Sequence, residues 1–290
     1  MPELPEAEVS RRTLAPVVVG RRIAGVTVVM PTRLSRPVKD PEGFAAALKG
    51  RRIAGLERRG KDLLFRLDDG AMLDLNLGLW ASVTLWDHPP VKGETPRLGL
   101  VLELEPAEAP GLPVDGQKVP SRPFLVVADV TFARWGVYPY EPPAAPPPYD
   151  AASPELTTAV LASVAEGPAR RARTVKALLM DDRALLGIGN GYADEILWRA
   201  RLHPLRAPAS LDGREWEALA GAIPAELELA VAEGGESGYL DANGRPGRRE
   251  RPIHHHAGDP CPRCATALEG YVKGGRETDY CPVCQPVPTV

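Results

Sequence analysis

The N-terminal half of the chain alternates apolar and polar residues at short intervals, a period typical of half-buried β-strands. Turn-forming runs such as RRGKD and DDG separate the apolar segments, as expected for hairpins. The segments with this pattern are 22–30, 51–59, 62–70, 71–80, 98–105 and 124–130. Strands at this spacing predict a β-sandwich. A helix is predicted before it, over residues 2–15, with Pro2 and Glu3 in its first turn, where proline and acidic residues are tolerated.

The C-terminal half has the longer period of amphipathic helices. A proline-rich run, EPPAAPPPY, marks the change and is typical of a stiff linker. The predicted helices are 153–166, with Ser153 as N-cap and Pro154 as its first residue, 173–182, 192–202 and 211–235. The chain is therefore predicted to be an α+β multidomain protein.

The predicted boundaries follow these changes of pattern. Residues 1–140 form the helix and β-sandwich, 141–152 the linker, 153–235 the helical domain, and 236–290 a polar segment with a cysteine module. The proline-rich stretch 106–123 has no periodicity and is interpreted as a surface insertion.

Composition excludes several classes of protein. With 290 residues and 44% hydrophobic content, the chain can bury a proper core and is not disordered throughout. It has no apolar run near the ~20 residues that cross a bilayer, and its start lacks the apolar stretch of a signal peptide. The net charge of −3 does not favour nucleic acid, so any polyanion site requires local positive charge.

Four cysteines form a metal-binding pattern near the C-terminus. Cys261, Cys264, Cys281 and Cys284 make a CxxC-x16-CxxC arrangement, in which two knuckles can complete one tetrahedron. We expect one structural Zn²⁺ and a reducing compartment, the cytoplasm. Four thiolates leave no open position for chemistry. The intervening residues predict a hairpin with Gly274-Gly275 as its turn and Arg276 at its tip, either as a functional contact or as a solvated arginine.

Two further features leave alternatives open. The turn GIGNG (187–191) precedes a predicted helix that Asn190 would cap, which suits an anion site, although glycines also serve the packing of a helix-turn-helix corner. The triplet His254, His255 and His256 could bind metal, but the cysteines already form a full set, so a solvated loop is expected there.

Four stretches together resemble the formamidopyrimidine-DNA glycosylase family (Fpg/MutM) of the Fpg/Nei superfamily. They are PELPEAE, RRGKDLLF, LLGIGNGYADEILWRARLHP and the cysteine module, in family order from residue 2 to about 285. The resemblance implies a base-excision-repair DNA glycosylase with AP lyase activity, which removes oxidised bases from duplex DNA through an N-terminal proline Schiff base and β/δ-elimination. It also implies a β-sandwich, a helix–two-turn–helix domain, a lesion loop and a zinc finger. We expect a monomer that works on damaged double-stranded DNA at the bacterial nucleoid, without a membrane.

The resemblance assigns roles to the first residues. Pro2 matches the nucleophile, provided that Met1 is removed, and α-amino groups have pKa values of about 7.7–8.0, so a share is unprotonated at neutral pH. Glu3 matches the acid/base that shuttles protons during sugar-ring opening, and Glu6 a supporting acid near the pocket. Without the resemblance, this stretch reads as an ordinary helix start.

The resemblance also assigns phosphate contacts. Lys61, at the tip of RRGKD, joins the catalytic set as the lysine beside the lesion. Lys176, Asn190 and Arg276 match groups that hold the phosphates flanking a flipped nucleotide. For each lysine a solvated charge is the alternative.

Departures from the family pattern concern lesion recognition. Residues 76–81 read NLGLWA where the family usually reads HLGM[ST]G, so Asn76 replaces the histidine and Leu79 the methionine that fills the gap left by the flipped base. Residues 131–136 read TFARWG where the family usually reads DPRRFG.

The second departure changes the residues that face the opposite strand. The intercalating arginine falls on Ala133, which cannot hydrogen-bond a cytosine, so weak discrimination of the opposite base is expected. Arg134 is expected to contact DNA, and Trp135 is expected to stack on it as the aromatic wedge.

Two functional hypotheses follow. The first is a glycosylase/AP lyase with an altered lesion range, such as bulkier lesions or oxidised pyrimidines. The second is a catalytically weak or inactive relative that binds abasic or distorted DNA. The joint presence of Pro2, Glu3, Lys61 and Asn190 favours the first, because a binder has no use for a terminal proline.

Overall fold

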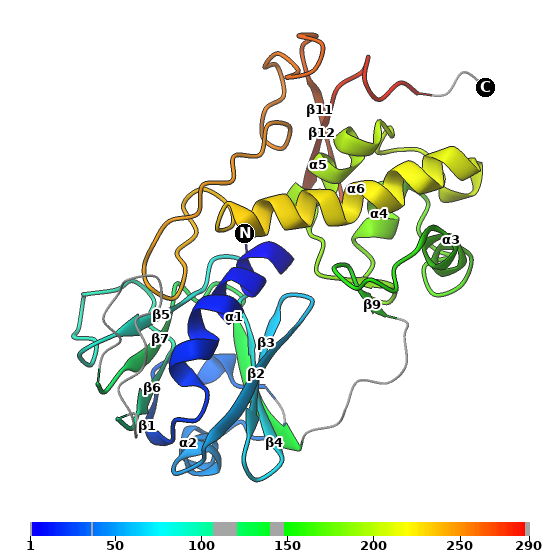
Figure 1. Cartoon of the computed structure of the whole chain (residues 1–290). Helices are drawn as coiled ribbons and strands as arrows, with labels where there is room; N and C mark the ends of the chain where they lie inside the picture. The colour runs from blue at the N-terminus through cyan, green and yellow to red at the C-terminus, as the bar shows by residue number, and fades with distance from the viewer. Residues whose placement is uncertain (1, 36, 107–120, 140–147, 288–290) are drawn as a thin grey trace. The chain divides into compact units, whose positions relative to one another are not determined.

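A computed structural model describes residues 2–35, 37–106, 121–139 and 148–287, and its elements are labelled in Figure 1. The chain divides into two compact units. The first comprises Met1–Pro143 and Gly234–Arg248, and the second Ala144–Glu233 and Arg249–Val290. Residues 234–248 thus belong with the N-terminal unit, although the sequence pattern groups 236–248 with the cysteine module. Within the described ranges, no helix is both long and apolar enough to cross a membrane.

The first unit contains the predicted β-sandwich, built from two four-stranded antiparallel sheets. One sheet has the order β1 (Ile23–Val28), β6 (Leu100–Leu104), β7 (Phe124–Ala128), β5 (Ser82–Trp86). The other has the order β2 (Ile53–Arg59), β3 (Asp62–Leu67), β4 (Ala71–Asn76), β8 (Arg134–Pro139). Alternate residues point inward and form the core, as Leu100 and Leu102 do in β6, because side chains alternate between the faces of a strand.

Helix α1 (Leu4–Val18) packs on β2 and β3, as Figure 1 shows for the blue segment. It begins two residues later than predicted, because Glu3 is the N-cap and Pro2 precedes the helix. A short helix α2 (Pro41–Leu48) and a 3₁₀ turn η1 (Pro31–Arg33) were not predicted from the pattern. The predicted insertion lies mostly outside the described residues, as does most of the linker.

The second unit contains the predicted helices and the cysteine hairpin. Its elements are β9 (Tyr149–Asp150), α3 (Thr158–Glu166), α4 (Val175–Leu179), β10 (Leu185–Leu186), α5 (Asn190–Ala200), η2 (Pro208–Ser210), α6 (Gly213–Ala232), β11 (Glu269–Lys273) and β12 (Arg276–Tyr280). The prediction that Ser153 is the N-cap of the helix over 153–166 is wrong, because α3 begins at Thr158. Thr157 is the N-cap, and its Oγ1 accepts a hydrogen bond from Val160 N at 3.3 Å.

A buried carboxyl group in α5 connects this helix to the segment before the cysteines. Glu195 Oε1 accepts hydrogen bonds from the backbone N–H groups of Ile253 and His254, both at 3.0 Å. Burial, only partly offset by these hydrogen bonds, raises the pKa of Glu195 to about 7.

The raised pKa of Glu195 predicts a pH-dependent stability. Between pH 4.5 and 7 the folded chain keeps a proton that the unfolded chain has released, so the free energy of unfolding falls as pH rises through this window. Glu195→Gln, which stays neutral, is expected to be more stable than wild type at pH 8 by up to about 3 kcal/mol, a gain that shrinks towards pH 4. Urea unfolding at both pH values measures it, and an equal difference at both would contradict the assignment.

Candidate functional site

A small cavity in the first unit is lined in part by Pro2, the predicted nucleophile. Its volume is about 190 Å³. The lining residues are Pro2, Trp80, Ser82, Asp129 and the consecutive run from Glu236 to Leu240. The start of the chain, the β4–β5 turn and the 234–248 segment therefore meet around Pro2.

Glu3, which follows Pro2 in the chain, and Glu6 are both buried. They form a capping box at the start of α1, in which Glu3 N donates to Glu6 Oε2 at 2.7 Å and the Glu3 side chain accepts from Glu6 N. The structure thus gives both acids a structural role, and each adjoins a lining residue of the cavity: Glu3 follows Pro2, and Glu6 accepts a hydrogen bond from Glu236 N. A helix N-terminus also stabilises negative charge there.

One face of α1 holds the 234–248 segment in place. The contacts are Glu236 N donating to Glu6 Oε1 at 2.8 Å, Ser10 Oγ with Tyr239 OH at 2.8 Å, and Ala242 N donating to Thr13 Oγ1 at 3.2 Å. The three helix positions are four and three residues apart and lie on one face. Sequence reasoning identified Glu6 but missed Ser10 and Thr13, whose spacing on a predicted helix was the available signal.

Lys61 lies, half-buried, in the two-residue turn of the β2–β3 hairpin, as the sequence predicts. The adjacent strand positions are Asp62 and Asn76, which are paired across β3 and β4. Asn76 Nδ2 donates to Asp62 Oδ1, and Asn76 Oδ1 accepts from Gly78 N at 3.1 Å. The residue that replaces the family histidine therefore has partners within the sheet.

The two divergent loops lie against each other. Leu79 N donates to Thr131 O at 2.9 Å, and a side chain on Gly78 would meet the backbone of Ala133 at 2.4 Å. Because Gly78 also has φ of +59°, only glycine fits this approach. Leu79 is half-buried and Ala133 is buried, so Ala133 supplies no side chain to the surface.

The prediction that Trp135 acts as an aromatic wedge is wrong. Trp135 is 1% exposed and belongs to the core, because β8 pairs with β4 and turns Trp135 inward together with Val137 while Arg134 stays exposed. The exposed aromatic side chain of this loop is Phe132, at 68%.

These positions predict that truncation of Trp135 costs far more stability than truncation of Phe132. Trp135→Ala is expected to lower the free energy of unfolding by about 3–5 kcal/mol, because it removes a large core side chain. Phe132→Ala is expected to change the free energy of unfolding by less than about 0.5 kcal/mol. Chemical denaturation of both variants measures this, and similar costs for the two would contradict the placement.

The second unit gives Lys176 a different role from the predicted phosphate contact. Lys176 is 6% exposed, and its Nζ lies 2.7 Å from Asp194 Oδ1, 2.8 Å from Thr278 Oγ1 and 2.9 Å from Glu277 O. An ammonium group has three hydrogens, so these protein oxygens use them all. Lys176 therefore ties α4 to α5 and to strand β12.

Asn190 is the first residue of α5, and the N-cap is Gly189 instead of the predicted Asn190. The Asn190 Nδ2 donates a hydrogen bond to Glu277 O at 2.8 Å, so Asn190 also connects the 187–191 turn to β12. Arg251, which sequence reasoning missed, fills the space beside this turn, because a side chain on Gly191 would lie 1.5 Å from its guanidinium. An arginine and a helix N-terminus thus lie together, a combination suited to a phosphate.

The expectation of a solvated histidine loop is wrong for His254. This residue is 5% exposed, and its Nδ1 lies 2.7 Å from Asp194 Oδ2. His255 and His256 are more exposed and pair with Glu277 and Asp259, respectively. His254 therefore shares Asp194 with Lys176 in a buried charged cluster.

The four cysteines come together as predicted. Cys261 and Cys284 Sγ lie 3.9 Å apart, Cys264 and Cys281 Sγ lie 3.4 Å apart, and all four Sγ atoms lie within 4.8 Å of one another. These separations suit one tetrahedral Zn²⁺ with Zn–S bonds of about 2.3 Å. Cys284 N also donates to Cys281 Sγ at 3.3 Å, so the second knuckle is held by a hydrogen bond of its own.

The hairpin turn after the first knuckle also agrees with the prediction. Lys273 pairs with Arg276 across Gly274 and Gly275, whose φ values are +59° and +74°. A two-residue turn with both central φ values positive is the type I′ turn that such hairpins favour. Arg276 is exposed next to this turn.

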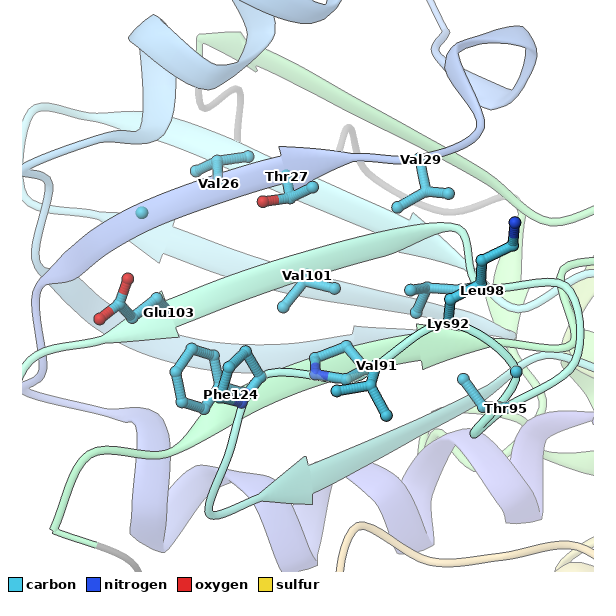
Figure 2. A pocket seen from close by; sticks show the side chains of 14 residues that line it. Val26, Thr27, Val29, Val91, Lys92, Thr95, Leu98, Val101, Glu103 and Phe124 are labelled. Atoms are coloured by element: carbon cyan, nitrogen blue, oxygen red, sulfur yellow. The ribbon is translucent and has the colours of Figure 1, made fainter.

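A larger cavity of about 520 Å³ lies on the outer face of the sheet that contains β1 and β6. Figure 2 shows the apolar side chains of Val101 on β6 and Phe124 on β7, with Leu98 and Val91 near them. Glu103 and Lys92 are the ionisable residues of its lining. Because the cavity contains none of the predicted catalytic or DNA-binding residues, the Pro2 cavity is the better candidate for chemistry.

Known proteins have the same sequence of domains: an N-terminal domain, a helical domain and a zinc finger. Residues 1–111 match the model of the formamidopyrimidine-DNA glycosylase N-terminal domain, residues 151–240 that of the formamidopyrimidine-DNA glycosylase H2TH domain, and residues 258–287 that of the zinc finger found in FPG and IleRS. A formamidopyrimidine-DNA glycosylase of Geobacillus kaustophilus is 38% identical, over 98% of this chain and 100% of the relative.

Solved structures match over nearly the whole chain as well. MutM (Fpg) from Thermus thermophilus has a TM-score of 0.79 and 31% identity, covering 99% of this chain and 100% of that one. Lactococcus lactis Fpg in complex with DNA containing an abasic site has a TM-score of 0.79 and 25% identity, covering 98% and 100%. The chain is therefore a member of the formamidopyrimidine-DNA glycosylase family.

Proposed function

We propose that this protein is a base-excision-repair DNA glycosylase with AP lyase activity on damaged duplex DNA. The observation that carries the proposal is the position of Pro2 on the wall of a cavity that it shares with the 236–240 segment, while the buried residues Glu3 and Glu6 adjoin Pro2 and Glu236, respectively. Membership of the family, whose curated relatives are named formamidopyrimidine-DNA glycosylase, supports the same activity. We further propose that the protein acts as a monomer in the bacterial cytoplasm, at the nucleoid.

The proposed chemistry begins after Met1 is removed. The lone pair of the Pro2 amine attacks C1′ of the damaged nucleoside, and the bond from C1′ to the base breaks as the base leaves with its electrons and takes a proton. Glu3 moves protons during the opening of the sugar ring. The Pro2 nitrogen loses its proton, the bond between C1′ and O4′ breaks as O4′ takes a proton, and the nitrogen and C1′ form an iminium. Loss of a proton from C2′ then forms the C2′–C3′ double bond and expels the phosphate from C3′ by β-elimination. Loss of a proton from C4′ expels the phosphate from C5′ by δ-elimination.

Each unit supplies proposed contacts to DNA. In the first unit these are Lys61, Leu79 and Arg134. Phe132 takes the wedge role instead of Trp135, because it is the exposed aromatic residue of its loop. In the second unit the proposed contacts are Asn190, Arg251 and Arg276. Lys176 acts there through its hydrogen bonds to Glu277 O and Thr278 Oγ1, which tie β12 to α4. The structural Zn²⁺, when bound, holds the hairpin that carries Arg276.

Cleavage of defined duplexes separates this function from the alternative, a catalytically inactive binder of abasic or damaged DNA. The purified protein is incubated with duplexes that contain 8-oxoguanine, thymine glycol or an abasic site, and with an undamaged duplex. Strand cleavage at a damaged position, absent from the undamaged duplex, is the expected result. Tight binding to the abasic duplex without any cleavage would support the alternative.

A further inference from the structure

An exposed tryptophan forms part of the wall of the Pro2 cavity. Trp80 is 58% exposed, although its neighbours Leu77 and Ala81 are buried. The turn that carries it is fixed, because Leu79 N donates to Thr131 O at 2.9 Å and Ala81 N to Leu77 O at 3.1 Å. The backbone thus directs Trp80 away from the core and into the lining of the cavity.

The rest of this wall offers polar groups but little aromatic surface. The lining includes Ser82, Asp129 and residues 236–240. Tyr239 is buried, and its hydroxyl is paired with Ser10 Oγ at 2.8 Å. Among the residues that line this cavity, Trp80 is therefore the one aromatic side chain with an accessible face. The resemblance to the family indicates that a serine or threonine usually stands at this position.

An accessible indole on the wall of the cavity can stack on a planar base but not on a base with a puckered ring. Stacking of a base on an aromatic side chain is worth about 1–3 kcal/mol, and it requires that the two flat faces approach within van der Waals contact. Oxidised purines such as 8-oxoguanine are planar. Pyrimidines saturated at C5 and C6, such as dihydrothymine and thymine glycol, have tetrahedral carbons whose substituents keep the ring away from a flat partner.

We infer that Trp80 is a stacking wall for the flipped base, which makes this site select planar damaged bases over ring-saturated ones. The inference rests on the proposed glycosylase function and adds to it a residue that sets the substrate class. An abasic site has no base to stack, so the lyase step on a preformed abasic site does not depend on Trp80.

Single-turnover rates on three duplexes of one sequence test this inference. The duplexes contain 8-oxoguanine, dihydrothymine or an abasic site, and the proteins are wild type, Trp80→Ala and Trp80→Phe. Trp80→Ala is expected to lower 8-oxoguanine excision by about 5- to 150-fold, the range equivalent to 1–3 kcal/mol. Excision of dihydrothymine and cleavage of the abasic duplex are expected to stay within about threefold of wild type, and Trp80→Phe is expected to recover most of the lost rate.

A matched change controls for general effects on DNA distortion. Phe132→Ala removes an aromatic residue that is exposed but outside the cavity, so it is expected to lower excision of both bases by a similar factor. If Trp80→Ala lowers all three rates equally, or leaves 8-oxoguanine excision unchanged, the stacking inference is wrong while the proposed function stands. If wild type cleaves none of the three duplexes, the proposed function fails and the inference fails with it.

Discussion

Replacing Pro2 with glycine is expected to lower base excision by on the order of 10³-fold or more, because the reaction then lacks its positioned secondary amine. Glycine keeps an α-amino group but loses the ring that fixes the nitrogen against the cavity wall. The change lies before the first residue of α1, so the helix and the capping box of Glu3 and Glu6 remain. Single-turnover excision of 8-oxoguanine measures the effect.

A proline inside α1 provides the control. Pro16 lies inside α1, is exposed, and does not line the cavity. Pro16→Ala is therefore expected to keep wild-type excision. Equal rates for Pro2→Gly and wild type would contradict the nucleophile assignment, as would equal losses for the two proline variants.

Loss of zinc is expected to have the second large effect. Cys261→Ser removes one of four ligands, so the zinc content should fall from one ion per chain to well below one. Strand β12 then loses its support, and with it Lys176 loses Thr278 and Glu277 as partners. Lys176 keeps its ion pair with Asp194, but each hydrogen-bond partner lost by a buried polar group costs about 1–3 kcal/mol, so we expect a clear fall in the melting temperature and in affinity for DNA.

Zinc analysis, thermal melting and DNA binding by the full-length protein measure this effect. His256→Ala is the matched control, because His256 is an exposed residue close to the first cysteine that pairs with Asp259 and is not among the four clustered thiols. It should keep zinc and melting temperature. Cys261→Ser protein with a full zinc content and unchanged melting would contradict the structural role of the ion.

Features that depend on local sequence were predictable. The CxxC pairs, the Gly274-Gly275 turn and the hairpin that carries Lys61 each follow from a few adjacent residues, and the structure has all three. The β-sandwich followed from the period of apolar residues, because that period matches strands with one buried face.

Features that depend on distant partners were not predictable in the same way. The burial of Trp135 depends on the pairing of β8 with β4, although its alternation with Arg134 and Val137 was a signal for an inward position. Lys176 and His254 were expected to be solvent-exposed or near phosphate. Both instead meet Asp194, a contact that only the folded chain reveals.

The same reason explains the parts of the site that were missed. Tyr239 is 229 residues from Ser10 along the chain, so no local pattern predicts their hydrogen bond. Trp80 differs from these residues, because its position in a divergent motif was visible in the sequence. Its place on the wall of the Pro2 cavity required the fold of the β4–β5 turn.

The central claim is that the amine of Pro2 forms a covalent link to the sugar. Wild-type protein is mixed with a duplex that contains an abasic site, borohydride is added, and the cross-linked peptide is identified by mass spectrometry. We expect one adduct, reduced from the iminium, on a peptide that begins at Pro2 and lacks Met1. An adduct on a lysine such as Lys61, or an active protein that retains Met1, would contradict the account.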